Sequence, residues 1–142
     1  MSRDHNKLRV FQLADELVLV VYRCAGSFPP EERFGLQSQI RRAAVSVPSN
    51  IVEGCARQSS AEYAHFLSIA MGSASETRYL LGLAQRLGYL TASDSEKAES
   101  RYEELIRSLQ KLISTVQGMD GPPAATLQLR APASGKDLRP RT

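Results

Sequence analysis

The chain has 142 residues, which suits a single domain with one hydrophobic core. It lacks tryptophan and only 6% of its residues are aromatic, so we expect a core of leucine, isoleucine, valine and alanine. The net charge is +3, but residues 119–142 hold four basic and two acidic residues, which leaves +1 for residues 1–118. A nearly neutral body argues against a dedicated nucleic-acid-binding domain, because such domains are usually clearly basic.

The N-terminal segment, residues 1–7, is polar, has no apolar core of a signal peptide, and is expected to be frayed. A first helix is predicted over residues 8–25, because apolar residues recur there at alternating steps of three and four, at Phe11, Ala14, Val18, Val21 and Ala25. Residues 17–21 favour a strand on propensity alone, although the flanking helical period favours the helix. The apolar run of residues 17–22 is too short to span a membrane, and we expect a soluble cytoplasmic protein.

Residues 26–30 (GSFPP) break the first helix, and Pro30 or Glu31 is predicted to begin a second helix that continues to about Arg57. Its first turn would hold Glu31 and Glu32, where the helix dipole favours negative charge. One face is an apolar stripe with steps of four and three, formed by Ile40, Ala44, Val47, Ile51 and Cys55. Pro48 predicts a kink in this helix; the alternative is that one helix ends at Val47 and another begins with Pro48.

A third helix is predicted from a capping box at Ser59 and Glu62 to about Leu87, with Gly88 as its C-terminal cap. Its apolar stripe consists of Tyr63, Leu67, Ala70, Ala74, Thr77, Leu81 and Ala84. Residues 70–75 are unusually small, and since Gly72 costs about 1 kcal/mol of helix propensity relative to alanine, we expect close packing against a neighbouring backbone to compensate.

A second capping box at Ser93 and Glu96 predicts a fourth helix to about Val116, closed by Gly118. Its apolar stripe consists of Ala98, Tyr102, Leu105, Leu109, Leu112 and Val116. Residues 119–142 are rich in Pro, Gly, Ala and Ser and predict a disordered basic tail. Four amphipathic helices with short connections predict an all-α fold, an antiparallel up-down-up-down four-helix bundle over residues 8–118.

Catalytic and metal-binding patterns are absent from the sequence. His5 and His65 are the only histidines, and they form neither a metal-ligand pair nor a catalytic group with a positioned serine. No enzyme activity, metal or cofactor is therefore expected. Cys24 and Cys55 lie on apolar helix faces outside any CxxC pair, which favours two buried free thiols, although spacing alone leaves a disulfide between them open.

Polar residues on the second helix predict a structural network. Arg42, Ser46, Asn50, Glu53 and Arg57 recur on one face, and Glu76 lies beside the small residues of the third helix. We interpret Glu53 and Glu76 as members of buried ion pairs with Arg42 or Arg78 that fix helix or subunit register; a polar binding site is the alternative. Candidate nucleic-acid contacts are Arg33, Arg41, Arg42 and Arg57, with intramolecular ion pairs as the competing interpretation.

Residues 28–90 resemble the four-helix bundle proteins encoded in 23S rRNA intervening sequences. The positions that carry the resemblance are Phe28-Pro29, Glu32-Arg33, Leu36, Gln39-Ile40, Arg42-Ala43, Ser46, Asn50-Ile51, Glu53-Gly54, Gly72-Ser73 and Glu76. The resemblance implies a noncatalytic homo-oligomer, a pentameric ring or barrel, that associates with structured RNA. Related accessory proteins of diversity-generating retroelements bind a reverse transcriptase and nucleic acid, but they are strongly basic. A protein–protein scaffold or accessory subunit without RNA specificity is the alternative.

Overall fold

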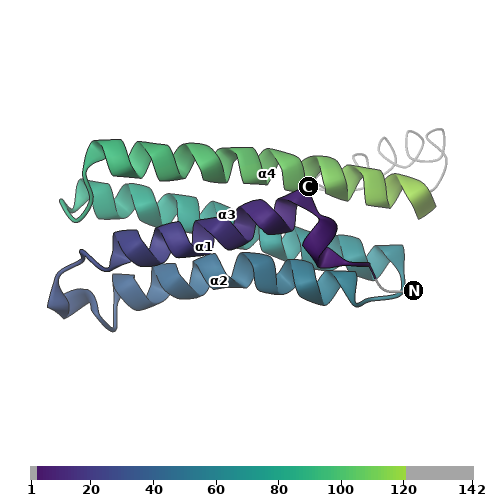
Figure 1. The fold of residues 1–142 in the computed structure, drawn as a ribbon, viewed down its shortest axis with the longest axis horizontal. Coiled ribbons are helices and arrows are strands. Elements are labelled where there is room, and N and C mark those ends of the chain that lie inside the picture. The colour runs from purple at the N-terminus through teal and green to yellow at the C-terminus, as the bar shows by residue number, and fades with distance from the viewer. Residues whose placement is uncertain (1–2, 121–142) are drawn as a thin grey trace, which may run out of the picture.

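The computed structural model describes residues 3–120 and shows a bundle of four α-helices preceded by short 3₁₀ turns (Figure 1). The helices are α1 (Arg9–Ala25), α2 (Leu36–Cys55), α3 (Ser60–Arg86) and α4 (Ala92–Asp120), and the turns are η1 (His5–Lys7) and η2 (Pro30–Glu32). Successive helices run in opposite directions in Figure 1. Each helix packs against two neighbours, α1 and α3 each lying between α2 and α4. The predicted all-α bundle is confirmed; the predicted tail lies outside the described residues, except that α4 extends to Asp120.

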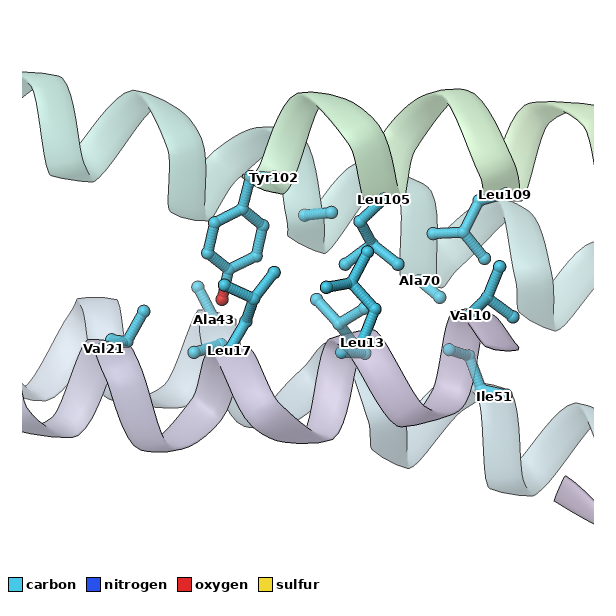
Figure 2. Close-up of a cluster of buried hydrophobic side chains, with 14 of the residues drawn as sticks. Val10, Leu13, Leu17, Val21, Ala43, Ile51, Ala70, Tyr102, Leu105 and Leu109 are labelled. Carbon is cyan, nitrogen blue, oxygen red and sulfur yellow. The ribbon is translucent and has the colours of Figure 1, made fainter. Parts of the chain in front are cut away.

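One continuous core runs along the bundle, and Figure 2 shows side chains from all four helices meeting in it. Every predicted stripe residue of α2 and α3 is buried. On α1, the predicted stripe residues Ala14, Val21 and Ala25 are buried, whereas Phe11 and Val18 are half-buried. Leu13 and Leu17 complete the buried side of this helix. On α4, Leu112 is half-buried and the neighbouring Ile113 is buried.

Helix α2 is continuous through the buried Pro48, so the alternative of two separate helices is wrong. The predicted start at Pro30 or Glu31 is also wrong, because α2 begins at Leu36 after η2. Gly35, directly before α2, has the non-helical dihedral angles φ −106° and ψ −114°. The Glu32 carboxylate then accepts a hydrogen bond from the Leu36 amide at 2.9 Å. Glu32 thus acts as a side-chain cap in front of the helix, satisfying an amide that has no partner within it.

Arg3, in the segment predicted to be frayed, contacts the end of α2. The Arg3 amide donates to the Cys55 carbonyl at 2.9 Å, and its guanidinium donates to the Arg57 carbonyl at 3.1 Å. The guanidinium also lies 4.1 Å from the centroid of the Tyr63 ring. Carbonyls at a helix C-terminus lack internal partners and carry partial negative charge, which explains why a cation holds this segment against the end of α2.

The helix boundaries follow most of the predicted caps. The Ser59 side chain accepts from the Glu62 amide at 3.1 Å, as predicted, and Gly88 ends α3 with a positive φ of 82°. The cap of α4 was misplaced, because Thr91 rather than Ser93 accepts from the Asp94 amide, at 3.0 Å. The predicted stop at Gly118 is wrong, since the glycine lies inside α4. Within residues 3–120, no helix combines the length and apolarity needed to cross a membrane.

Candidate assembly and nucleic-acid surfaces

The predicted polar network of α2 is only partly assembled. The Asn50 side-chain amide donates to the Ser46 carbonyl at 2.8 Å and to its hydroxyl at 3.0 Å. Ser73 of α3, which the sequence interpretation did not include, donates to the Ser46 hydroxyl at 3.0 Å and links the two helices. Short hydroxyl side chains can form such a bond only where two helix backbones approach closely. Spacing within α3 alone could not have identified Ser73 as the partner of Ser46.

Within one chain, Glu53 and Glu76 do not form the predicted buried ion pairs with Arg42 or Arg78. Glu53 pairs with Arg57, two residues beyond the end of α2, and both side chains are more than a third exposed. Arg78 pairs with Glu103 of α4 at 3.1 Å. Glu76 accepts from the Gln39 side chain at 3.4 Å. The physical reason is the helix phase: residues two apart, such as 76 and 78, point to different sides, so Arg78 faces α4 while Glu76 faces α2.

An exposed face lies beside this polar contact, where α2 and α3 meet. It comprises Ser46, Asn50, Ile69, Gly72 and Ser73, which we call the α2–α3 face. Ile69 remains 39% exposed, and a Cβ atom added at Gly72 would have no neighbour within 4 Å. The close packing predicted to compensate for Gly72 is therefore absent within the described chain. The glycine lowers helix propensity on a surface that nothing in residues 3–118 covers.

A different glycine brings α2 and α3 together. Gly54 is buried, and a Cβ atom there would lie 3.0 Å from the Phe66 Cβ and 3.2 Å from a ring carbon of Tyr63. The same end holds the buried Cys55 thiol and the buried Tyr63 ring. Burial raises the pKa of Tyr63 to about 12 and also raises the pKa of Cys55. Cys24 and Cys55 are both free thiols, Cys55 buried and Cys24 half-buried.

The four arginines predicted to contact nucleic acid do not converge on one surface. Arg41 donates to the Tyr22 carbonyl at 3.2 Å and lies 4.7 Å from the centroid of that ring, on the α1 side of α2. Arg57 lies 5.0 Å from the Phe66 ring, on the α3 side. Arg57 also follows the end of α2 at Cys55, and the helix from Arg41 to that end is about 21 Å long at 1.5 Å per residue. Two of the four arginines, Arg41 and Arg57, therefore form contacts within the chain.

The other two arginines are more accessible. Arg33 lies in the segment before α2, 5.4 Å from the ring of Phe34, which is 88% exposed. Arg42 is exposed, and no described residue forms a hydrogen bond or ion pair with it. The sequence predicted all four arginines as nucleic-acid contacts. In the structure, Arg41 and Arg57 contact other residues of the chain, whereas Arg33 and Arg42 are exposed.

A groove on the α4 side of α3 was not predicted. It has a volume of about 350 Å³ and lies between α3 and α4, lined by Ser75, Arg78, Tyr79, Gly82, Arg86 and Glu99. The α3 positions 75, 79, 82 and 86 recur at steps of four, three and four, which places them on one helix face. That spacing is visible in the sequence, whereas the α4 residue that borders the groove, Glu99, is not identified by it.

Histidine, cysteine and carboxylate side chains are scattered over the described part of the chain. Among the residues described, no three histidine, cysteine, aspartate or glutamate side chains gather as a metal site would require. His65 is exposed and lies edge-on to Phe66, and His5 is half-buried against Phe11. Both histidines therefore have aromatic neighbours.

Comparisons with known proteins agree with the bundle. Residues 6–111 match the model of the family described as 23S rRNA-intervening sequence protein. The crystal structure of a protein of unknown function from the S23 ribosomal protein family of Bacteroides thetaiotaomicron is similar, with a TM-score of 0.69 and 28% sequence identity. The match covers 74% of this chain and 95% of that protein. No functionally curated protein matches this sequence.

Proposed function

Because the chain belongs to the 23S rRNA-intervening sequence protein family, we propose that it is a noncatalytic bundle that assembles into a homo-oligomer, a pentameric ring, and binds structured RNA. The observation that carries the assembly is the α2–α3 face. An exposed glycine in mid-helix is unfavourable unless something packs closely against it. No described residue of the same chain does so at Gly72, and a second copy of the chain supplies the missing contact.

The chemistry of the α2–α3 face suits contact between copies. Ile69 offers an apolar side chain beside the hydroxyl and amide groups of Ser46, Asn50 and Ser73. A second helix can approach such short side chains closely. The hydroxyl and amide groups can also form hydrogen bonds across an interface without the desolvation cost of a buried charge. We place the assembly in the cytoplasm, where thiols such as Cys24 and Cys55 stay reduced.

A matched pair of variants tests the assembly. Ile69→Lys puts a charge on the proposed interface, whereas Ser100→Lys puts the same charge on an exposed position of α4, outside the α2–α3 face. We expect light scattering to give a lower mass for Ile69→Lys than for the unmodified protein, and an unchanged mass for Ser100→Lys. Circular dichroism should show both variants folded. An unmodified protein that is monomeric at high concentration would refute the assembly.

RNA binding is tested by titrating a labelled RNA hairpin with the full chain at low and moderate salt. The exposed guanidinium groups of Arg33 and Arg42 are the first contacts to substitute, followed by Arg41 and Arg57. Phosphate contacts should give a salt slope of roughly −0.9 per contact on a duplex. Each arginine-to-alanine change that removes a contact should make the slope shallower by about that amount. Salt-independent binding would contradict phosphate contacts.

A protein–protein scaffold or accessory subunit, for example of a reverse transcriptase, is the second candidate. It is favoured by apolar side chains on the outside of α1, where Leu19 is 57% exposed and Tyr22 is 42% exposed. Assembly does not separate the two candidates, because both predict it. A protein that assembles but binds no hairpin RNA at low salt would support the scaffold over the RNA-binding function.

A further inference from the structure

The groove between α3 and α4 combines an exposed aromatic ring with an available cation. Tyr79 is 60% exposed, and the Arg86 guanidinium lies 5.9 Å from the centroid of its ring. Among residues 3–118, Arg86 takes part in no ion pair. Exposed aromatic rings beside arginine are the platforms on which proteins stack unpaired bases of RNA, with the guanidinium close to a phosphate or a base.

A similar pair elsewhere shows what is different here. Tyr22 and Arg41 also bring a guanidinium to a tyrosine ring, at 4.7 Å, but the Arg41 group donates to the Tyr22 carbonyl and is half-buried. That pair fastens α2 to α1. In the groove, Tyr79 and Arg86 come from the same helix, so their contact fastens nothing together. Their side chains are therefore free to receive a ligand.

The charges in the groove indicate how a ligand would lie. Arg78 is paired with Glu103 at 3.1 Å, so Arg86 is the cation available for a phosphate. Glu99 carries a carboxylate on the α4 side and accepts from the Ser95 hydroxyl at 2.6 Å. An ionised carboxylate only accepts hydrogen bonds and repels phosphate, so it suits the donor edge of a base. Guanine presents an imino and an amino donor side by side, which one carboxylate can accept together.

We propose that this groove binds one unstacked nucleotide of RNA, with guanine stacked on Tyr79 and hydrogen-bonded to Glu99, and its phosphate on Arg86. The proposal rests on the proposed RNA-binding function and deepens it by naming a site and a base. The volume of about 350 Å³ lies at the lower end of the range for small-ligand sites and suits one nucleotide. Loops of structured RNA supply such unpaired bases.

The test measures fluorescence anisotropy of the labelled RNA hexamers UUGUUU, UUAUUU and UUUUUU with the full chain. We expect UUGUUU to bind roughly tenfold more tightly than the other two. Tyr79→Ala should weaken that binding by roughly five- to a hundredfold, because stacking on the ring is lost. Tyr79→Phe keeps the ring and should stay close to the unmodified affinity. Tyr22→Ala is the matched control and should leave the affinity for UUGUUU unchanged.

Two further variants separate the roles of the charged groups. Arg86→Ala should make the salt slope shallower by about 0.7, the value for one phosphate contact on a single strand. Glu99→Gln should remove the preference for UUGUUU over UUUUUU. Equal binding of all three hexamers by the unmodified protein would overturn the guanine assignment.

The groove and the RNA-binding function can fail separately. If Tyr79→Ala binds like the unmodified protein, or loses no more than Tyr22→Ala, the groove proposal is overturned. The same holds if the chain binds an RNA hairpin but no hexamer, and in that case the RNA-binding function survives. If it binds neither, both proposals fall. Melting temperatures of Tyr79→Ala and Tyr22→Ala show whether a loss of RNA affinity reflects unfolding. Because Tyr79 is exposed, Tyr79→Ala should melt at nearly the same temperature as the unmodified protein.

Discussion

The two sides of α3 pack against their neighbours in different ways. Toward α2 the contact is close: a Cβ at Gly54 would lie 3.0 Å from the Phe66 Cβ, and two serine hydroxyls meet across the helices. Toward α4 the outer contact is open: a Cβ at Gly82 would lie 3.6 Å from a carboxylate oxygen of Glu99, which is ordinary contact distance. Helix α3 thus packs closely against α2 on one side and borders an open charged groove toward α4.

This difference shows that a glycine in a helix has no single meaning. Gly54 permits close approach of two helices, Gly82 opens the floor of a groove, and Gly72 lies on a surface with no neighbour within 4 Å. All three lower helix propensity by a similar amount. Only the surroundings in the folded chain distinguish a glycine required for packing from one that a ligand or a second subunit can use. Substitutions at these positions can therefore test the comparison directly.

The largest effect is expected from Gly54→Ala. The new methyl group would press against the Phe66 Cβ, which cannot swing away as a side-chain end could, and against the Tyr63 ring. Overpacking of this kind costs about 1–3 kcal/mol, offset by the helix propensity of alanine. We expect the free energy of unfolding to fall by about 1–2 kcal/mol, measured by urea denaturation.

Gly82→Ala is the matched control for the open side. Its methyl group would be in ordinary contact, so the gain in helix propensity should raise the free energy of unfolding by up to about 1 kcal/mol. Opposite signs for the two variants would establish the difference between the two sides of α3. If Gly54→Ala is as stable as the unmodified protein, the close contact with α2 has no energetic basis.

The fold was predictable because helix α3 and helix α2 carry unambiguous apolar stripes. All twelve predicted stripe residues on these two helices are buried. Boundaries were less predictable where a side chain distant from the helix start decides them. Glu32 caps α2 from in front of Gly35, and Arg3 binds the carbonyl groups at the other end of the same helix. Neither interaction has a local sequence signature of the kind that Ser59 and Glu62 provide.

The candidate sites were less predictable than the fold. Residue types on α2 suggested buried ion pairs, but Glu53 pairs with Arg57 just beyond the end of its own helix, and Arg78 pairs with Glu103 on α4. Pairing depends on which helix each side chain faces, and that follows from rotation and neighbour identity rather than from spacing alone. The groove required the position of Glu99 on α4 relative to Tyr79 on α3, which the sequence does not contain.

A smaller effect, with two opposite signs, is expected from Gly72→Ala. With no neighbour within 4 Å, the added methyl group should stabilise the isolated bundle by about 0.5–1 kcal/mol. In the assembled state it should push a second copy away and raise the dissociation constant, measured by analytical ultracentrifugation. A stabilised bundle with unchanged assembly would show that Gly72 lies outside the interface, and it would leave the outer surface of α3 without a role in association.

The smallest effect is expected where the segment before α2 meets the segment after α3. There the Tyr89 hydroxyl donates a hydrogen bond to the Glu32 carboxylate at 2.9 Å. Hydrogen bonds from the Leu36 amide and then the Tyr89 hydroxyl lower the pKa of Glu32 from 4.5. A carboxylate with a lowered pKa stabilises the fold above that unfolded-state value, and the contribution is lost as the pH falls through the lower folded-state pKa.

Between about pH 6 and about pH 3, the melting temperature of the unmodified protein should therefore fall further than that of Glu32→Gln. Circular dichroism measures both. Tyr89→Phe removes only the second donor and should fall between them. Equal acid sensitivity in all three proteins would mean that the Glu32 carboxylate is not held by these donors in solution. The connection between the start of α2 and the end of α3 would then rest on Phe28 and Tyr89, whose ring centroids are 5.5 Å apart.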